Sequence, residues 1–137
     1  MNPTIPYKAN DTNKSYREVF YDASLWISDF DFFKTELLFL KVLLKSNSFK
    51  SNIPNLFERL QLLIKEVDQF TEENNILNKK AKHLSNFVGG IIKKDVFSFN
   101  DDYLEQYHNL AAEVFLFAQK YKNFKRGLYE FLSEIIL

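Results

Sequence analysis

The sequence predicts an all-α protein: an up-down-up antiparallel bundle of three long helices, at approximately residues 15–46, 53–92 and 100–136. The chain has three glycines and three prolines among 137 residues, too few for the many tight turns of a β-sandwich or barrel. Three long stretches instead repeat their apolar residues in alternating steps of four and three, the period of coiled-coil helices that pack along a seam. We therefore expect a bundle built from three such seams.

The first helix begins at Ser15 and Glu18, which match the S-x-x-E capping box that satisfies two amide groups at a helix start. Its seam consists of Val19, Ala23, Trp26, Phe30, Phe33, Leu37, Leu40 and Leu44. Charged residues such as Asp29, Lys34 and Glu36 interrupt the apolar stretch, whereas a membrane span needs about 20 mostly apolar residues. The pattern predicts a core helix and no membrane span.

The second helix follows the segment "KSNSFKSNIP", and Pro54 is suited to its first turn. One seam crosses the polar run "TEENN", which predicts a continuous helix: Leu56, Leu60, Leu63, Val67, Phe70, Asn74, Leu77, Ala81, Leu84, Val88 and Ile91. Asn74 is either a buried residue that specifies register or oligomeric state, or a residue at an exposed level of the helix. Whether the helix ends at Gly89 or continues to Lys94 stays open.

The third helix follows "DVFSFNDD", where Ser98 or Asn100 is the expected cap. Every position of its seam is apolar or aromatic: Tyr103, Tyr107, Leu110, Val114, Phe117, Tyr121, Phe124, Leu128, Phe131 and Ile135. We expect residues 15–137 to form one domain after a flexible N-terminal arm at residues 1–14, which is rich in Asn, Thr, Pro and Lys. The chain has no cysteine and the start does not read as a signal peptide, so we expect a cytoplasmic protein.

The first helix carries more apolar residues than its seam needs. A candidate interface, Leu25, Phe32, Phe39 and Leu43, lies on one side of the seam, and Ile27, Leu38 and Val42 lie on the other. The third helix adds Leu104, Phe115, Leu116 and Leu132. These residues thicken an aromatic core, form a second apolar face that is buried in a homodimer or against a protein partner, or line a small-molecule site. The second alternative follows because large apolar patches seldom stay exposed.

Folding the chain as hairpins about residues 49 and 96 predicts which charges share a level. Asp29, Glu66, Lys125 and Arg126 then meet near the middle of the bundle as a network of boundary ion pairs. A paired-carboxylate acid–base site there would also require a cleft and perturbed pKa values.

The same hairpin places His83 and His108 at one level, with Glu105 preceding His108 in an E-x-x-H pattern. Di-iron bundles of the ferritin-like type use this spacing twice, together with further glutamates. This chain has one copy, and Glu18 or Asp22 would have to complete the site. A metal site at His83, Glu105 and His108 is therefore the alternative to a protein without a cofactor.

No catalytic motif of the common hydrolase, phosphate-loop or dinucleotide-binding classes occurs in the sequence. The formal net charge of zero argues against nucleic-acid binding through phosphate contacts. The sequence thus favours a non-enzymatic interaction or assembly module, with a metal-binding helical bundle as the second hypothesis.

Overall fold

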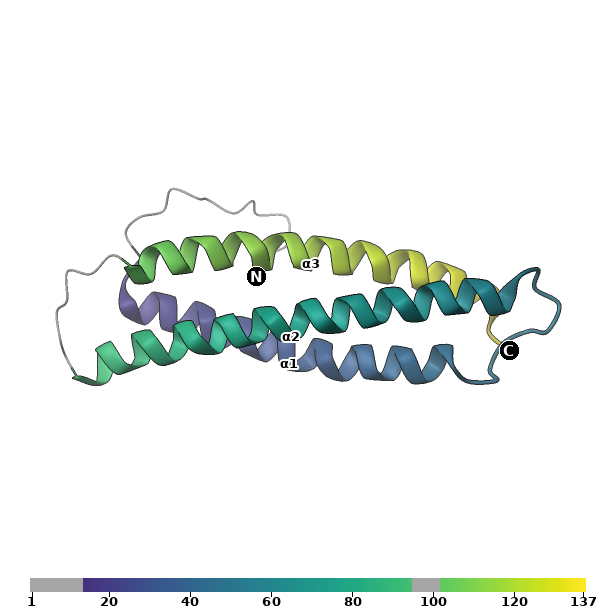
Figure 1. Cartoon of the computed structure of the whole chain (residues 1–137), viewed down its shortest axis with the longest axis horizontal. Coiled ribbons are helices and arrows are strands. Elements are labelled where there is room, and N and C mark those ends of the chain that lie inside the picture. Colours follow the sequence, from purple (N-terminus) through teal and green to yellow (C-terminus); the bar gives the residue numbers. More distant parts are fainter. Residues whose placement is uncertain (1–13, 95–101) are drawn as a thin grey trace.

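The computed structural model describes residues 14–94 and 102–137, which form three long helices (Figure 1). These are α1 (Tyr16–Leu44), α2 (Leu56–Lys94) and α3 (Asp102–Ile135). α1 and α3 run in the same direction and α2 runs in the opposite direction, so the predicted all-α, up-down-up bundle is confirmed. The predicted caps Ser98 and Asn100, and the N-terminal arm apart from Lys14, lie outside the described residues.

The predicted capping box at the start of α1 is present. The Glu18 amide donates a 3.2 Å hydrogen bond to Ser15 Oγ, and the Ser15 amide donates a 3.3 Å hydrogen bond to Glu18 Oε1. Both amides lack an intrahelical partner at this position, so the side chains satisfy them and fix where the helix begins.

α2 begins later than the sequence suggests. Pro54 lies two residues before Leu56 and not in the first helical turn. Asn55 has a φ of 54°, a left-handed conformation that asparagine tolerates better than most residues, and its carbonyl accepts a 3.0 Å hydrogen bond from the Arg59 amide. At its other end α2 continues through both glycines to Lys94, which resolves the alternative left open by the sequence.

The predicted seams supply most of the core. On α1 every seam residue is buried except Phe33, which is half-buried and packs against the core. On α3 all seam residues are buried except Phe124 and Phe131, which are also half-buried. Aromatic rings fill the space between the helices: the Phe117 and Tyr121 rings lie 5.8 Å apart, and Phe70 lies within 6.0 Å of both. Large aromatic side chains therefore pack α2 against α3 across the core.

Two asparagines of α2 set its register against α1. The buried Asn74 donates from Nδ2 to the Phe30 carbonyl at 3.0 Å, and one turn later Asn78 donates to Asp31 Oδ1 at 3.0 Å. The sequence midpoint of each hydrogen-bonded pair falls between residues 52 and 55. The predicted hairpin centre at residue 49 is therefore wrong by about a helical turn. The cause is the connection of residues 45–55, which is longer than a tight turn and moves the start of α2 along α1.

The register of α2 against α3 agrees with the predicted hairpin centre at residue 96. Lys80 Nζ lies 2.9 Å from Glu113 Oε2, and Lys120 Nζ lies 3.0 Å from Glu73 Oε2. Both pairs are centred midway between residues 96 and 97. Residues of α2 and α3 that the sequence places at one level therefore do lie at one level.

The C-terminus closes the end of the bundle where α1 turns into α2. The Lys50 amide donates to the Ile135 carbonyl at 2.8 Å and the Leu137 amide donates to the Ser48 carbonyl at 2.9 Å, forming an isolated bridge between Phe49 and Ile136. This contact orders the long connection. Within the described ranges, no helix has the length and apolarity that crossing a membrane requires.

Candidate functional site

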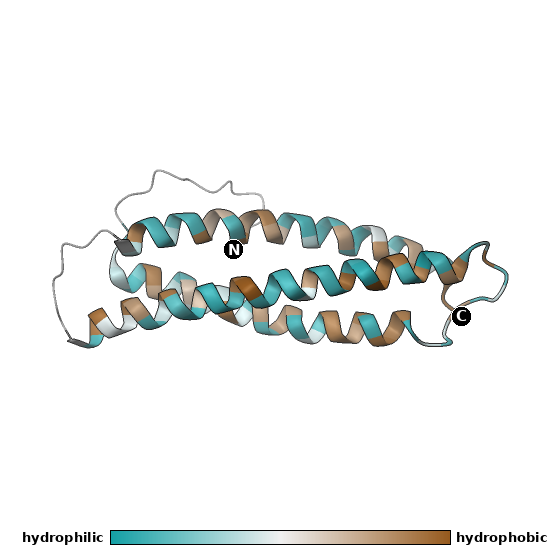
Figure 2. Cartoon of the chain, viewed as in Figure 1, coloured by the Kyte–Doolittle hydropathy of each residue, from teal (hydrophilic) through white to brown (hydrophobic). Residues whose placement is uncertain are grey.

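The outward side of α1 carries a second line of residues with the same steps of four and three as the core seam. We call it the outer seam, and it consists of Tyr21, Leu25, Ser28, Phe32, Thr35, Phe39 and Val42. All seven are exposed, and the five large ones strongly so: Tyr21 63%, Leu25 44%, Phe32 60%, Phe39 62% and Val42 66%. None is charged. Figure 2 shows hydrophobic residues recurring along α1.

The predicted interface residues do not all lie on the outer seam of α1. Leu25, Phe32 and Phe39 are exposed on the outer seam, whereas Leu43 is half-buried and packs against the core. The extra apolar residues therefore do not all thicken the core. Tyr21 and Val42, which the sequence argument did not include in this interface, extend the outer seam at its two ends.

A buried tyrosine joins α3 to α1 through a carboxylate. Tyr121 is 1% exposed and its Oη donates a 2.7 Å hydrogen bond to Glu36 Oε1, to which Lys125 Nζ also donates at 2.9 Å. The same ammonium group lies 4.4 Å from the centre of the Tyr121 ring. Burial, followed by the hydrogen bond to Glu36, raises the pKa of Tyr121 far above its usual range. This phenol therefore stays neutral and serves as a hydrogen-bond donor.

The same arrangement recurs two heptads towards the N-terminus of α1. Tyr107 Oη donates a 2.6 Å hydrogen bond to Asp22 Oδ2, and Lys14 Nζ lies 3.2 Å from the same oxygen. In both cases 85 residues separate the tyrosine from the carboxylate. Sequence reasoning missed these pairs, although the equal spacing of 14 residues on α1 and on α3 was visible. Their geometry indicates a structural role in joining α1 to α3, since each carboxylate already binds a lysine ammonium group and a tyrosine hydroxyl.

Among the described residues, only Lys125 of the predicted network makes an ion pair. Lys125 pairs with Glu36, and the ion pairs among the described residues include none made by Asp29, Glu66 or Arg126, which are all exposed. The shifted register of α2 explains part of the difference, because it moves Glu66 away from the level of Asp29. The heptad position explains the rest: Glu36, one heptad after Asp29, faces α3.

The three predicted metal ligands share a level but do not converge. His83 and Glu105 are exposed and His108 is half-buried against Tyr107, with 5.3 Å between the two ring centres. No group of three His, Asp or Glu side chains in residues 14–94 and 102–137 is arranged to hold a metal ion. The Asp22 carboxylate, a suggested fourth ligand, is engaged by Tyr107 and Lys14.

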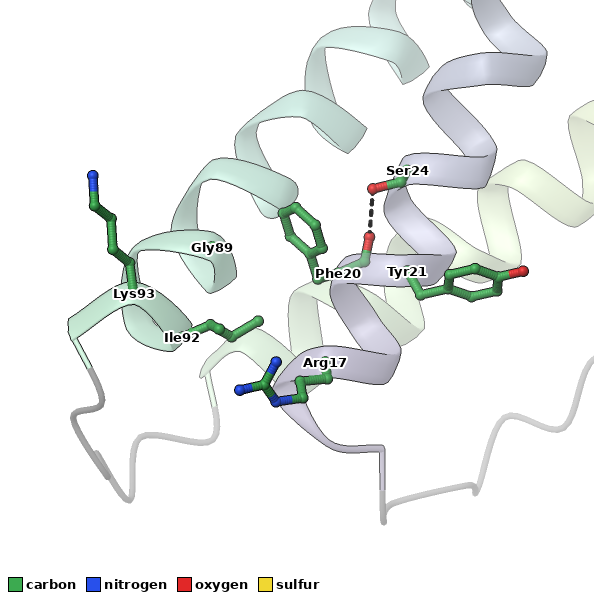
Figure 3. A pocket seen from close by; sticks show the side chains of 7 residues that line it. All are labelled: Arg17, Phe20, Tyr21, Ser24, Gly89, Ile92 and Lys93. Carbon is green, nitrogen blue, oxygen red and sulfur yellow. Dashed lines mark hydrogen bonds between the residues drawn. The ribbon is translucent and has the colours of Figure 1, made fainter.

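A pocket of about 410 Å³ lies between the start of α1 and the end of α2 (Figure 3). Its lining residues are Arg17, Phe20, Tyr21, Ser24, Gly89, Ile92 and Lys93. Phe20 fits against Gly89, where an added Cβ would lie 3.2 Å from the ring. The Ser24 hydroxyl in its lining donates to the Phe20 carbonyl at 2.8 Å. Among the described residues its lining includes no carboxylate and no imidazole, so these residues form no acid–base pair.

Comparison of the chain with protein-family models, curated proteins and solved structures finds no match. The function therefore has to be argued from the surfaces and side-chain groups of this structure.

Proposed function

We propose that the protein is a non-enzymatic interaction or assembly module and that the outer seam of α1 is its docking surface. The observation that carries the proposal is the continuous line of exposed, uncharged residues from Tyr21 to Val42. Helices that are apolar on two opposite sides normally bury both of them. The core covers one side of α1, and a partner would cover the other.

The regular spacing supports a helical partner. Exposed apolar residues also occur on α2, for example Phe57, Leu62 and Ile76, but they do not repeat in steps of four and three. Scattered apolar residues are normal on a protein surface. A seam of seven positions with one period fits the way in which one helix packs its side chains between those of another.

Site-specific photo-crosslinking tests this function in the cells that produce the protein. A photoreactive benzoylphenylalanine replaces Phe39 on the outer seam, and the control variant carries it in place of Leu62, which is 63% exposed on α2. We expect a discrete adduct, either of two copies or with another protein, from position 39 and not from position 62. Identical patterns from both positions, or no adduct from position 39, would contradict the proposal.

Metal analysis of the purified protein tests the alternative hypothesis of a metal-binding bundle. The proposal predicts less than about a tenth of an equivalent of iron, zinc or manganese per chain. A near-stoichiometric metal content that is lost in His108→Ala would overturn the proposal in favour of the metal-binding bundle, and His83→Ala and Glu105→Gln would then test the other two predicted ligands.

A further inference from the structure

We infer that the occupant of the outer seam is a second copy of this chain, with the two α1 helices packed antiparallel about a two-fold axis that passes close to Phe32. This inference rests on the proposed function, because it names the partner of the same surface. Two observations support it: the order of side-chain sizes along the seam and the apolar area that the seam offers.

The order of large and small side chains along the outer seam is almost the same from either end. Phe32 stands at its centre, with the small Ser28 and Thr35 on its two sides and large apolar residues beyond them. A two-fold axis near Phe32 pairs residues of like size between the copies: Tyr21 with Val42, Leu25 with Phe39, Ser28 with Thr35, and Phe32 with Phe32. An isologous interface requires this kind of self-complementarity.

The small residues give the central aromatic rings their space. In a helix pair each side chain inserts between residues three and four positions apart on the facing helix. The ring of Phe32 would therefore lie beside Ser28 and Thr35 of the other copy, and the two central rings could approach in the offset geometry that aromatic pairs prefer. Large residues at all three central levels would instead force the helices apart.

The apolar area is sufficient for a specific but weak dimer. An aromatic side chain presents about 150–250 Å² when fully exposed, so the five large residues of the outer seam offer roughly 500 Å² per copy. Both copies together would bury on the order of 1,000 Å², the lower limit for a biological interface. We therefore expect a dissociation constant in the micromolar range.

Disulfide trapping tests both the partner and its orientation, because the chain has no cysteine of its own. Two single variants, Ser28→Cys and Thr35→Cys, are prepared with tags of different mass and oxidised separately and as a mixture. Antiparallel pairing places residue 28 opposite residue 35, so the mixture should give at least ten times more crosslinked dimer than either variant alone. Efficient crosslinking of each variant alone would show a parallel pair and overturn the orientation.

Sedimentation velocity from about 1 to 200 µM provides the second measurement. The wild type and the control Leu62→Ser should shift from monomer to dimer over this range, and Phe32→Ser should remain monomeric with an unchanged helical circular dichroism spectrum. A wild type that stays monomeric throughout would overturn the inference of a second copy. If position 39 still forms a photo-adduct with another protein, the proposed function survives; if it does not, both fail.

Discussion

Tyr121 donates its phenolic hydrogen bond to Glu36 across 2.7 Å, and Tyr107 repeats this relationship with Asp22 at 2.6 Å. The two pairs are spaced by 14 residues on each helix, which is two heptads, so they fix the parallel register of α1 against α3. A slip of one heptad would bring Asp29 to the level of Tyr121 and leave Glu36 without this donor. The polar pairs therefore specify the alignment of α1 with α3, whose seams are otherwise apolar or aromatic and would tolerate sliding.

Tyr121→Phe should destabilise the fold by about 1–3 kcal/mol, because it removes a hydrogen bond to a charged group that is mostly buried. The side chains of Glu36 and Lys125 are only 17% and 20% exposed, so water replaces the lost donor poorly. Urea unfolding followed by circular dichroism measures the change. Tyr129→Phe is the matched control, since Tyr129 is 47% exposed and should change the unfolding free energy by less than about 0.5 kcal/mol.

A double-mutant cycle separates the hydrogen bond from the loss of packing. If Tyr121 acts through Glu36, Tyr121→Phe should be less damaging in a Glu36→Gln background than in the wild type, with a coupling energy of about 1 kcal/mol or more. Additive effects of the two substitutions would show that the hydroxyl contributes by filling space alone.

The alkaline stability of the protein should depend on Tyr121. Burial raises the pKa of this phenol in the folded state, whereas in the unfolded chain it titrates near 10. Above pH 10 the unfolded state therefore loses a proton that the folded state retains, and stability falls by at most about 1.4 kcal/mol per pH unit from this group. Below pH 10 both states keep the proton and its stabilising contribution is complete.

Unfolding free energies measured from pH 9 to pH 11.5 test this dependence. The wild type should lose stability more steeply than Tyr121→Phe. The difference in unfolding free energy between the two proteins should therefore become smaller as the pH rises. Tyr129, whose pKa burial also raises, remains in both proteins and cancels in the comparison. Parallel curves would mean that Tyr121 ionises equally well in both states.

Alanine substitutions of the three glycines in α2 and α3 are expected to change the stability of the protein by different amounts. Gly90→Ala and Gly127→Ala should each stabilise the protein by about 1 kcal/mol, because both glycines are inside helices and an added Cβ meets nothing within 4 Å. Gly89→Ala should gain clearly less, since its Cβ would lie 3.2 Å from the Phe20 ring. Thermal unfolding of the three variants ranks them; equal gains would show that the half-exposed Phe20 ring moves aside freely.

Much of this fold follows from the sequence, because its dominant signal is periodic. The seams of α1, α2 and α3 are long, and few glycines or prolines interrupt them, so the apolar spacing identifies both the helices and their buried sides. Folding the chain as a hairpin about residue 96 gave the correct register of α2 against α3, as the Lys80–Glu113 pair shows. The corresponding hairpin about residue 49 was wrong for α1 and α2, because the connection between them contacts the C-terminus through Lys50 and Ile135. No local sequence pattern encodes this long-range contact.

The candidate site was only partly predictable for a related reason. Spacing revealed that Leu25, Phe32 and Phe39 share one side of α1, but it could not decide whether α3 or solvent covers that side. Likewise Glu36 and Asp29 occupy equivalent heptad positions, and only the three-dimensional register shows that Glu36 meets Tyr121 while Asp29 remains exposed. Side-chain partners across helices depend on axial offsets of a few ångströms, which the seams leave undetermined.

Substitution of Asn74 tests whether this buried residue fixes the register of α2 at a cost in stability. Its side chain is fully buried in the seam of α2; Nδ2 donates to the Phe30 carbonyl, and Oδ1 has no hydrogen-bond partner among the described residues. Asn74→Leu should raise the free energy of unfolding by about 1 kcal/mol, because it removes an unsatisfied buried acceptor and adds apolar contact. The Phe30 carbonyl lies inside α1 and keeps its helical amide donor.

Differential scanning calorimetry should show a rise in the melting temperature of about 3–5 °C for Asn74→Leu, and Asn75→Leu, at the adjacent exposed position, should leave it nearly unchanged. Because a buried asparagine commonly selects one register at the expense of stability, hydrogen exchange in Asn74→Leu should be faster near Phe30 and Asp31 despite the higher melting temperature. An unchanged or lower melting temperature would mean that the hydrogen bond to Phe30 outweighs the unsatisfied Oδ1, and Asn74 would then stabilise the fold as well as align it.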